Sequence, residues 1–170
     1  MIHLYEQLAK VKDWQHRKRL SLTDKQRYWL RGNHSLTKQL IEYSDNNFEL
    51  NLLGETWQKP YQHEAEVLRV KPEQECLVRE VELLCNKQVV VYARSIISPA
   101  AIEASGHELT KLGNVPLGHL LFKNAKVDLE TRELAKIIVS DKPSFARRTL
   151  YQLNNEDILV SEFFIEPLWQ

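Results

Sequence analysis

Two arginines lie inside apolar strand patterns in the middle of the sequence. Residues 76–84 (CLVREVELL) and 89–97 (VVVYARSII) are dominated by branched and apolar residues, which is typical of β-strands joined by a short turn. The side chains of a strand alternate between its two faces. Arg79 therefore shares a face with leucines and a valine, and Arg94 shares one with valine, tyrosine and isoleucine. An unpaired buried charge costs several kcal/mol, so both guanidinium groups need an anionic partner.

A carboxylate occupies a comparable position near the C-terminus. Glu162 interrupts the apolar face of a strand predicted over 158–165. One interpretation is a structural Arg–Glu pair, with the other guanidinium reaching the edge of the sheet. The other is a charged pocket inside the sheet, in which an arginine fork grips a carboxylate and the glutamate faces a hydroxyl group. Such a pocket suits a small ring with a carboxylate at one end and a hydroxyl at the other.

Length and composition place the chain among single-domain globular proteins. Its 170 residues suit one domain over 1–170, with 43% hydrophobic and 27% charged residues. Lysine plus arginine equals aspartate plus glutamate at 23 each, which argues against a nucleic-acid partner because such proteins usually carry a basic excess. No apolar run reaches membrane-spanning length, so we predict no membrane insertion. No long apolar stripe demands a partner, and we predict a monomer.

The cysteines and the N-terminus bear on where the protein works. Cys76 and Cys85 fall at the ends of one predicted strand, which holds them about 30 Å apart at about 3.3 Å per residue, far beyond disulfide reach. The N-terminal segment lacks the apolar core and the small-residue cleavage site of a signal peptide. Reduced thiols without a signal peptide predict a cytoplasmic protein.

Periodicity and capping signals predict an α+β fold with a single antiparallel sheet of about six strands and helices on one side. Thr23 and Gln26 have capping-box form, and Ser35 can cap the next helix. The predicted helices cover residues 4–11, 23–31, 36–43, 99–112 and 117–122. The predicted strands cover residues 48–54, 66–70, 76–84, 89–97, 146–153 and 158–165, and the ambiguous segment 127–135 is interpreted as a further strand because Val127, Leu129 and Thr131 alternate.

Motifs for metal, nucleotide and serine-hydrolase chemistry are absent from the sequence. Its six histidines and two cysteines show no H-x-x-x-H or C-x-x-C spacing, and there is no G-x-S-x-G, so no metal site is predicted. Residues 113–118 (GNVPLG) have the glycine spacing of a phosphate loop. They lack the Lys-Ser/Thr that follows in such loops, and Pro116 removes an N–H. We interpret this stretch as a turn that contacts a ligand through backbone amides.

Four short stretches, in order along the chain, resemble the chorismate pyruvate-lyase family. They are SLTK at 35–38, VREVELL at 78–84, LGNVPLG at 112–118 with LF at 121–122, and SEFF at 161–164. The resemblance extends over about residues 29–168. It implies a single antiparallel sheet with helical flaps over a buried ligand site, and the helices of residues 22–43 are the predicted lid.

The resemblance also implies a role for each embedded charge. Arg79 grips the ring carboxylate of chorismate, Glu162 meets the 4-hydroxyl group, and Arg94 lies near the departing enolpyruvyl group. The backbone amides of Leu36 and Leu117 lie beside the ligand. Leu36 stands where methionine is expected in the family, which bears on the apolar shape of the pocket. The predicted catalytic residues are thus Arg79, Glu162 and Arg94, and the predicted substrate-binding residues are Leu36, Arg79, Leu117 and Glu162.

The implied reaction is an elimination without cofactor or metal, the first step of ubiquinone biosynthesis. Chorismate loses its C4 proton and its C3–O bond, giving pyruvate and 4-hydroxybenzoate. Because aromatisation drives this reaction, the protein mainly positions and desolvates a dianion. Arg94 would stabilise charge on the leaving enolpyruvate, while Glu162 either orients the hydroxyl or takes part in proton transfer.

A second hypothesis is a non-enzymatic effector-binding module. A related sheet fold serves as the ligand-sensing half of some transcription regulators, and fold alone does not fix function. Such modules follow a basic DNA-binding domain, and no residue precedes Met1 here, so we favour the enzyme. The lyase would form 4-hydroxybenzoate from chorismate, whereas a sensor would bind a ligand without forming product.

Overall fold

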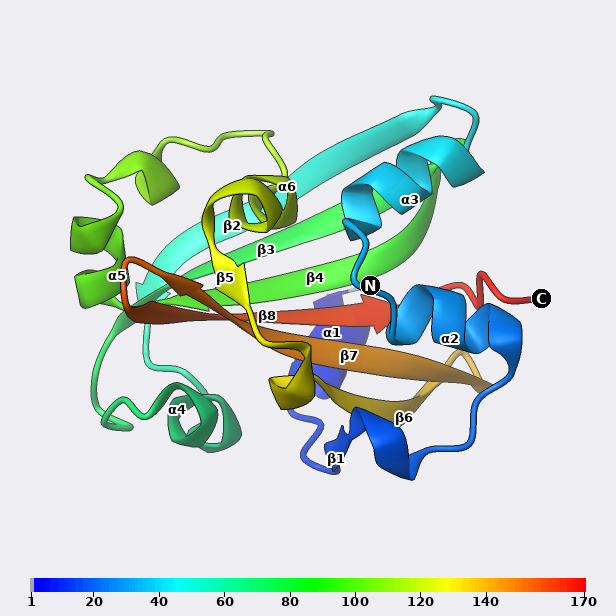
Figure 1. Ribbon diagram of the computed structural model, residues 1–170, viewed down its shortest axis with the longest axis horizontal. Coiled ribbons are helices and arrows are strands. Elements are labelled where there is room, and N and C mark those ends of the chain that lie inside the picture. Colours follow the sequence, from blue (N-terminus) through cyan, green and yellow to red (C-terminus); the bar gives the residue numbers. More distant parts are fainter. Residues whose placement is uncertain (1) are drawn as a thin grey trace.

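An antiparallel sheet of eight strands forms the centre of the protein (Figure 1). The computed structural model describes residues 2–170. The strand order is β1-β6-β7-β8-β4-β3-β2, and β5 pairs with β7 beside this path. The sheet exceeds the predicted six strands partly because β1 and β5 are pairs of residues too short to show a pattern. The strands are β1 (Gln15–His16), β2 (Phe48–Gln58), β3 (Cys76–Cys85), β4 (Gln88–Ile97), β5 (Lys126–Val127), β6 (Glu133–Val139), β7 (Lys142–Leu153) and β8 (Glu156–Phe164).

Two-residue turns join the long neighbouring strands. The β3–β4, β6–β7 and β7–β8 hairpins turn at residues 86–87, 140–141 and 154–155, and all of these residues have positive φ. Turns of this kind match the right-handed twist of the flanking strands. Each contains an asparagine or aspartate, which tolerates the left-handed conformation. The two hairpins predicted around residues 86–88 and 154–157 are therefore confirmed.

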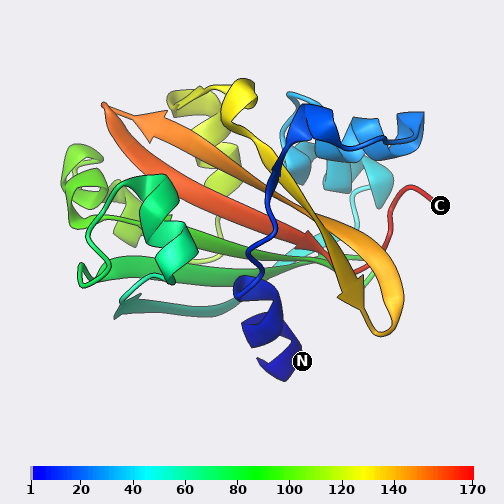
Figure 2. The ribbon, with the colours of Figure 1, turned by 90° about the horizontal axis from the view of Figure 1, so that it is seen from below.

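Helices cover both faces of the sheet (Figure 2). One face carries α2 (Asp24–Leu30), α3 (Leu36–Tyr43), α5 (Pro99–Ala104) and α6 (Leu117–Asn124). The other carries α1 (Ile2–Ala9) and α4 (Gln62–Leu68). Short 3₁₀ helices occur at Arg17–Arg19, Glu108–Thr110 and Leu129–Thr131. The prediction that helices lie on one side is wrong, because α1 and α4 bury the second face. In residues 2–170, no helix is both long and apolar enough to span a membrane.

The covered second face has its own apolar core. Tyr5 and Leu8 of α1 pack with Tyr92 and Phe163, and the α4 side chains pack over β3, β4 and β8. Glu82, on the face of β3 opposite Arg79, is only 9% exposed. Both faces of the central strands are therefore buried, and a charge on either face needs a partner.

Two predicted strands have a different structure. Residues 66–70 belong to α4 and the turn after it. Ala65 and Leu68, three residues apart, are both buried, which is helical spacing. The Glu64 carboxylate also accepts the N–H of Tyr61 at 2.8 Å and caps the helix start. Residues 127–135 are divided between β5, a 3₁₀ turn and β6 rather than forming one strand.

Candidate active site

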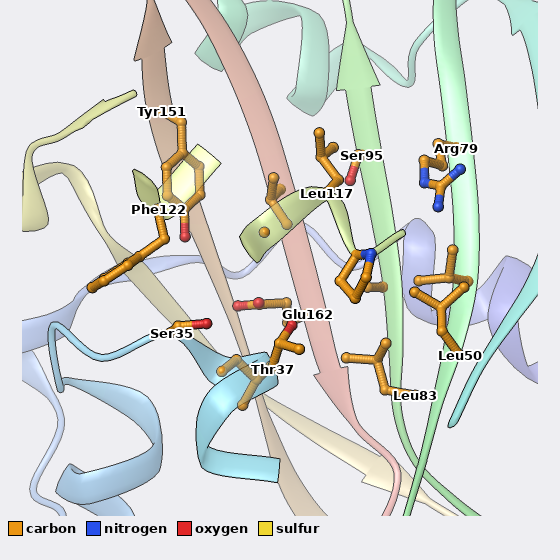
Figure 3. A pocket seen from close by; sticks show the side chains of 16 residues that line it. Ser35, Thr37, Leu50, Arg79, Leu83, Ser95, Leu117, Phe122, Tyr151 and Glu162 are labelled. Atoms are coloured by element: carbon orange, nitrogen blue, oxygen red, sulfur yellow. The ribbon is translucent and has the colours of Figure 1, made fainter. Parts of the chain in front are cut away.

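A cavity lies between the sheet and the first turns of α3 and α6 (Figure 3). The space open to the centre of a water-sized sphere is about 40 Å³, more than the roughly 10–15 Å³ that one water needs. Apolar side chains form most of its walls, and a few polar groups lie among them, which is typical of small-molecule sites. The apolar wall includes Leu50, Val81, Leu83, Ala93 and Val160.

Arg79 forms one part of the cavity wall. It points from β3 on the same face as Ser95 of β4, and its side chain is 2% exposed. One terminal nitrogen is ion-paired with Glu55 of β2. The other donates to the carbonyl oxygens of Gly113 and Val115 at 2.7 and 3.0 Å. The guanidinium thus connects the sheet to the segment that leads into α6.

Glu162 lies two strands away on the same face. It is opposite Ala93 in the β4–β8 register and also lines the cavity. Arg147 of β7, 1% exposed, donates its Nε to Oε2 of Glu162 and one terminal nitrogen to the Trp29 carbonyl at 2.7 Å. Burial lowers the pKa of Arg147, but the charge of Glu162 outweighs it, so the pKa is raised. Arg79 and Glu162 therefore have separate partners and are not paired with each other.

Two helix N-termini reach the cavity. Leu36 and Leu117 are the first residues of α3 and α6, and both line the cavity. Backbone N–H groups in the first turn of a helix have no acceptor within that helix, and they carry a partial positive charge. Ser35 caps α3 by accepting the Lys38 N–H, whereas no side chain caps α6. The two helix starts thus bring unpaired donors to the edge of the cavity.

Arg94 lies on the opposite face, so its predicted place beside Arg79 and Glu162 is wrong. A bulge in β4 is the cause. A regular hairpin would pair Arg79 with Arg94, but the register shifts between Leu83 and Leu84, and Arg79 pairs with Ser95. A one-residue shift moves every side chain beyond it to the other face.

On that face Arg94 has partners of its own. Its guanidinium donates to both carboxylate oxygens of Glu64 at 2.8 and 3.1 Å, and a second carboxylate, Glu80, lies 3.5 Å away. Its charged carbon is 4.9 Å from the centre of the Tyr61 ring. Burial lowers the pKa of Arg94, but the hydrogen bond and charge of Glu64 raise it further, so the net shift is upward. Arg94 is a structural link between α4 and the sheet.

Comparison with known proteins identifies the family. The family model described as chorismate lyase matches residues 8–170. The chain belongs to the chorismate lyase family. It is 31% identical to the probable chorismate pyruvate-lyase of Idiomarina loihiensis, with 94% of this chain and 88% of the relative covered. It is 35% identical to the probable chorismate pyruvate-lyase of Pseudomonas putida, with 84% and 80% covered.

Solved structures show that this chorismate lyase fold extends beyond the family. The effector-binding domain of the Bacillus subtilis trehalose repressor superposes with a TM-score of 0.53 at 7% identity, covering 68% of this chain and 89% of that one. The ligand-binding domain of a putative GntR-family regulator from Bordetella bronchiseptica gives 0.53 at 12% identity, covering 69% and 83%. At such low identity these likenesses concern the fold alone.

Sequence reasoning missed part of this chorismate lyase family site. Arg147 and Tyr151 of β7 both face the cavity side of the sheet, and Arg132 interacts with Tyr151. Alternation along the predicted strand 146–153 places Arg147 and Tyr151 on one face with Thr149, a signal that was available in the sequence. Among the side chains that the structure describes, no group of three or more His, Cys, Asp or Glu is arranged to hold a metal ion.

Proposed function

We propose that this protein is a chorismate pyruvate-lyase, which converts chorismate to 4-hydroxybenzoate and pyruvate in the first step of ubiquinone biosynthesis. One observation carries the proposal. Arg79 and Glu162, which have separate protein partners, line the same largely apolar cavity. A ring with a carboxylate at one end and a hydroxyl at the other would offer one polar group to each of these two side chains, and membership in the family supports the same substrate.

Arg79 would bind the ring carboxylate by exchanging partners. Its terminal nitrogens are engaged by Glu55 and by the carbonyls of Gly113 and Val115. A carboxylate that binds both terminal nitrogens must displace at least one of these groups. Because two of them belong to the segment before α6, binding at Arg79 would be coupled to that segment. This differs from the predicted lid, which consists of residues 22–43 alone.

Glu162 would face the 4-hydroxyl group. Arg147 engages its Oε2, which fixes the side chain and leaves Oε1 for a ligand. The N–H groups of Leu36 and Leu117 would complete the polar contacts. The apolar walls exclude water, so the dianion is held by a few fixed donors, and the reaction then follows from aromatisation.

Incubation of the purified protein with chorismate tests this proposal. We expect 4-hydroxybenzoate, followed by its absorbance, and an equal amount of pyruvate, followed with lactate dehydrogenase. Glu162→Gln is the matched variant for this assay. It keeps the shape of the side chain and removes its charge, so it tests whether the carboxylate of Glu162 is needed for product formation. Binding of chorismate or 4-hydroxybenzoate without turnover would favour the alternative of an effector-binding module.

A further inference from the structure

We propose that the Tyr151 hydroxyl donates a hydrogen bond to the ether oxygen of the leaving enolpyruvyl group, and that Arg132 positions this hydroxyl. The inference rests on the proposed function and adds one catalytic residue to the same cavity. Three features carry it: the place of Tyr151 in the cavity, the direction in which its proton must point, and an excess cation behind it.

Tyr151 is a buried tyrosine whose proton lacks an acceptor. Its side chain, 6% exposed, lines the cavity, and Figure 3 shows its hydroxyl reaching toward the side where Ser35 and Glu162 lie. The buried tyrosines on the other face differ. Tyr5 donates to Glu82 at 2.7 Å, and Tyr92 donates to a carboxylate of β3. Among the side chains that the structure describes, none accepts a hydrogen bond from the Tyr151 hydroxyl.

Arg132 fixes the direction of that proton. Its guanidinium, 2% exposed, donates to the Thr149 hydroxyl at 2.8 Å and to the Gly32 carbonyl at 2.6 Å, and it lies close enough to the Tyr151 hydroxyl to influence the pKa of both groups. A guanidinium has donors only. In any hydrogen bond between the two groups the Tyr151 oxygen is therefore the acceptor, and its own proton points elsewhere. Since Tyr151 lines the cavity, the proton is available to a ligand there.

Among the side chains that the structure describes, Arg132 has no ion-paired carboxylate, and Glu162 acts on it through its charge alone. Within the described residues, its hydrogen-bond partners are neutral, and no carboxylate lies within ion-pairing distance. Burial, followed by repulsion from Arg147, lowers the pKa of Arg132 to about 10, so the group remains charged at neutral pH. Burial and the charge of Glu162 raise the pKa of Tyr151, so the phenol keeps its proton. Tyr151 is thus a neutral donor polarised by a cation.

This donor fits the charge that develops in the reaction. The C3–O bond of chorismate breaks, and its electron pair stays on the ether oxygen, which becomes the enolate oxygen of pyruvate. C4 loses a proton as the ring becomes aromatic, and the methylene carbon of the enolate gains a proton to give the methyl group. Tyr151 keeps its own proton throughout. A fixed donor at an oxygen that becomes anionic stabilises the transition state more than the substrate.

Single-turnover kinetics with Tyr151→Phe test the inference. Enzyme in excess over chorismate removes any effect of slow product release. We expect the rate of 4-hydroxybenzoate formation to fall about 100-fold, because removing one donor to a developing oxyanion has an effect of that order. The dissociation constant of 4-hydroxybenzoate, which lacks the enolpyruvyl group, should change by less than about threefold. Tyr92→Phe is the matched control, with a buried hydroxyl on the opposite face, and should keep the wild-type rate.

Arg132→Lys supplies a second measurement. If Arg132 acts through Tyr151, the lysine variant slows the single turnover in the wild-type background but has little further effect in the Tyr151→Phe background. Should Tyr151→Phe fail to fold, the rate and product affinity of Arg132→Lys test the inference alone.

Four outcomes would overturn it. A Tyr151→Phe rate within threefold of wild type removes the donor, and an equal loss of 4-hydroxybenzoate affinity assigns Tyr151 to the ring instead. Independent effects of the two substitutions remove the positioning role of Arg132. Failure of the wild-type protein to form 4-hydroxybenzoate refutes the proposed function, and this inference with it.

Discussion

Replacing Arg79 by lysine perturbs the proposed carboxylate site most directly. Arg79 engages Glu55 and two carbonyl oxygens through two separate nitrogens, at 2% exposure. Lysine keeps the charge but concentrates it on one nitrogen, so it cannot reproduce a two-nitrogen grip on a carboxylate. Loss of such a contact in a desolvated site costs roughly 2–5 kcal/mol. We therefore expect kcat/KM for chorismate to fall by about 30- to 5,000-fold.

Arg94→Lys is the matched control for this experiment. Arg94 is on the next strand, 4% exposed and held by a two-nitrogen contact with Glu64, but it lies on the face away from the cavity. We expect it to lower the free energy of unfolding by about 1.5–3 kcal/mol, the usual cost of hydrogen bonds to a charged group, while kcat/KM stays close to wild type. For Arg79→Lys we expect the opposite: kcat/KM should fall more than the free energy of unfolding does.

Initial rates of 4-hydroxybenzoate formation, measured over a range of chorismate concentrations, give kcat/KM for each variant. Urea unfolding of the same preparations gives their stability. Near-wild-type turnover by Arg79→Lys would remove Arg79 from its role. An equal loss of activity in Arg94→Lys, with the fold intact, would show that the two faces of the sheet are not functionally separate.

Three further predictions concern the fold. Burial lowers the pKa of His63 below 6.5, so the unfolded chain binds a proton at this residue more readily than the folded protein does. The free energy of unfolding should therefore fall as the pH drops through 6.5. In urea unfolding, the His63→Gln variant should lose less stability than the wild type between about pH 7.5 and 5.5. Burial raises the pKa of both Cys76 and Cys85, so a thiol reagent should label neither until the protein unfolds, and rapid labelling of the native protein would contradict this. Leu40→Ala, at a fully buried position of α3, should cost about 2–5 kcal/mol in urea unfolding, and a loss below about 1 kcal/mol would show that α3 packs loosely.

The central hairpins could be predicted because local signals agree there. Alternating branched residues set the strands, and the asparagine turns set the connections. The place of Arg94 could not be predicted in the same way. Alternation tells which residues of one strand share a face, but the pairing with the next strand depends on every residue between them. The extra residue in β4, Val90, places Arg94 on the face opposite Arg79. A valine inside VVVY gives no sign in the sequence that a bulge occurs there.

For a related reason, only part of the charged site could be predicted from the sequence. Arg79 and Glu162 each stand out within one strand, and the prediction that they face a common cavity depended on register. The backbone contact at Leu36 entered only through the family resemblance, because a backbone amide leaves no trace in side-chain chemistry, whereas the glycine spacing of residues 113–118 already indicated one near Leu117. The ion pair of Arg147 with Glu162 joins two strands, and the periodicity of one strand does not show which residues it pairs with on the next.

The two faces of the sheet bury charge with opposite balances, and this difference explains why only one of them is suited to an anion. On the face with α1 and α4, two buried arginines meet more carboxylates than they can neutralise: Arg94 and Arg148 against Glu64, Glu80 and Glu133. On the cavity side, three buried arginines have two carboxylate partners: Arg79, Arg132 and Arg147 against Glu55 and Glu162. A buried excess cation is costly unless an anion joins it. An acidic ligand between Arg79 and Tyr151 would supply that anion, so we expect the excess positive charge on this side of the sheet to favour its binding.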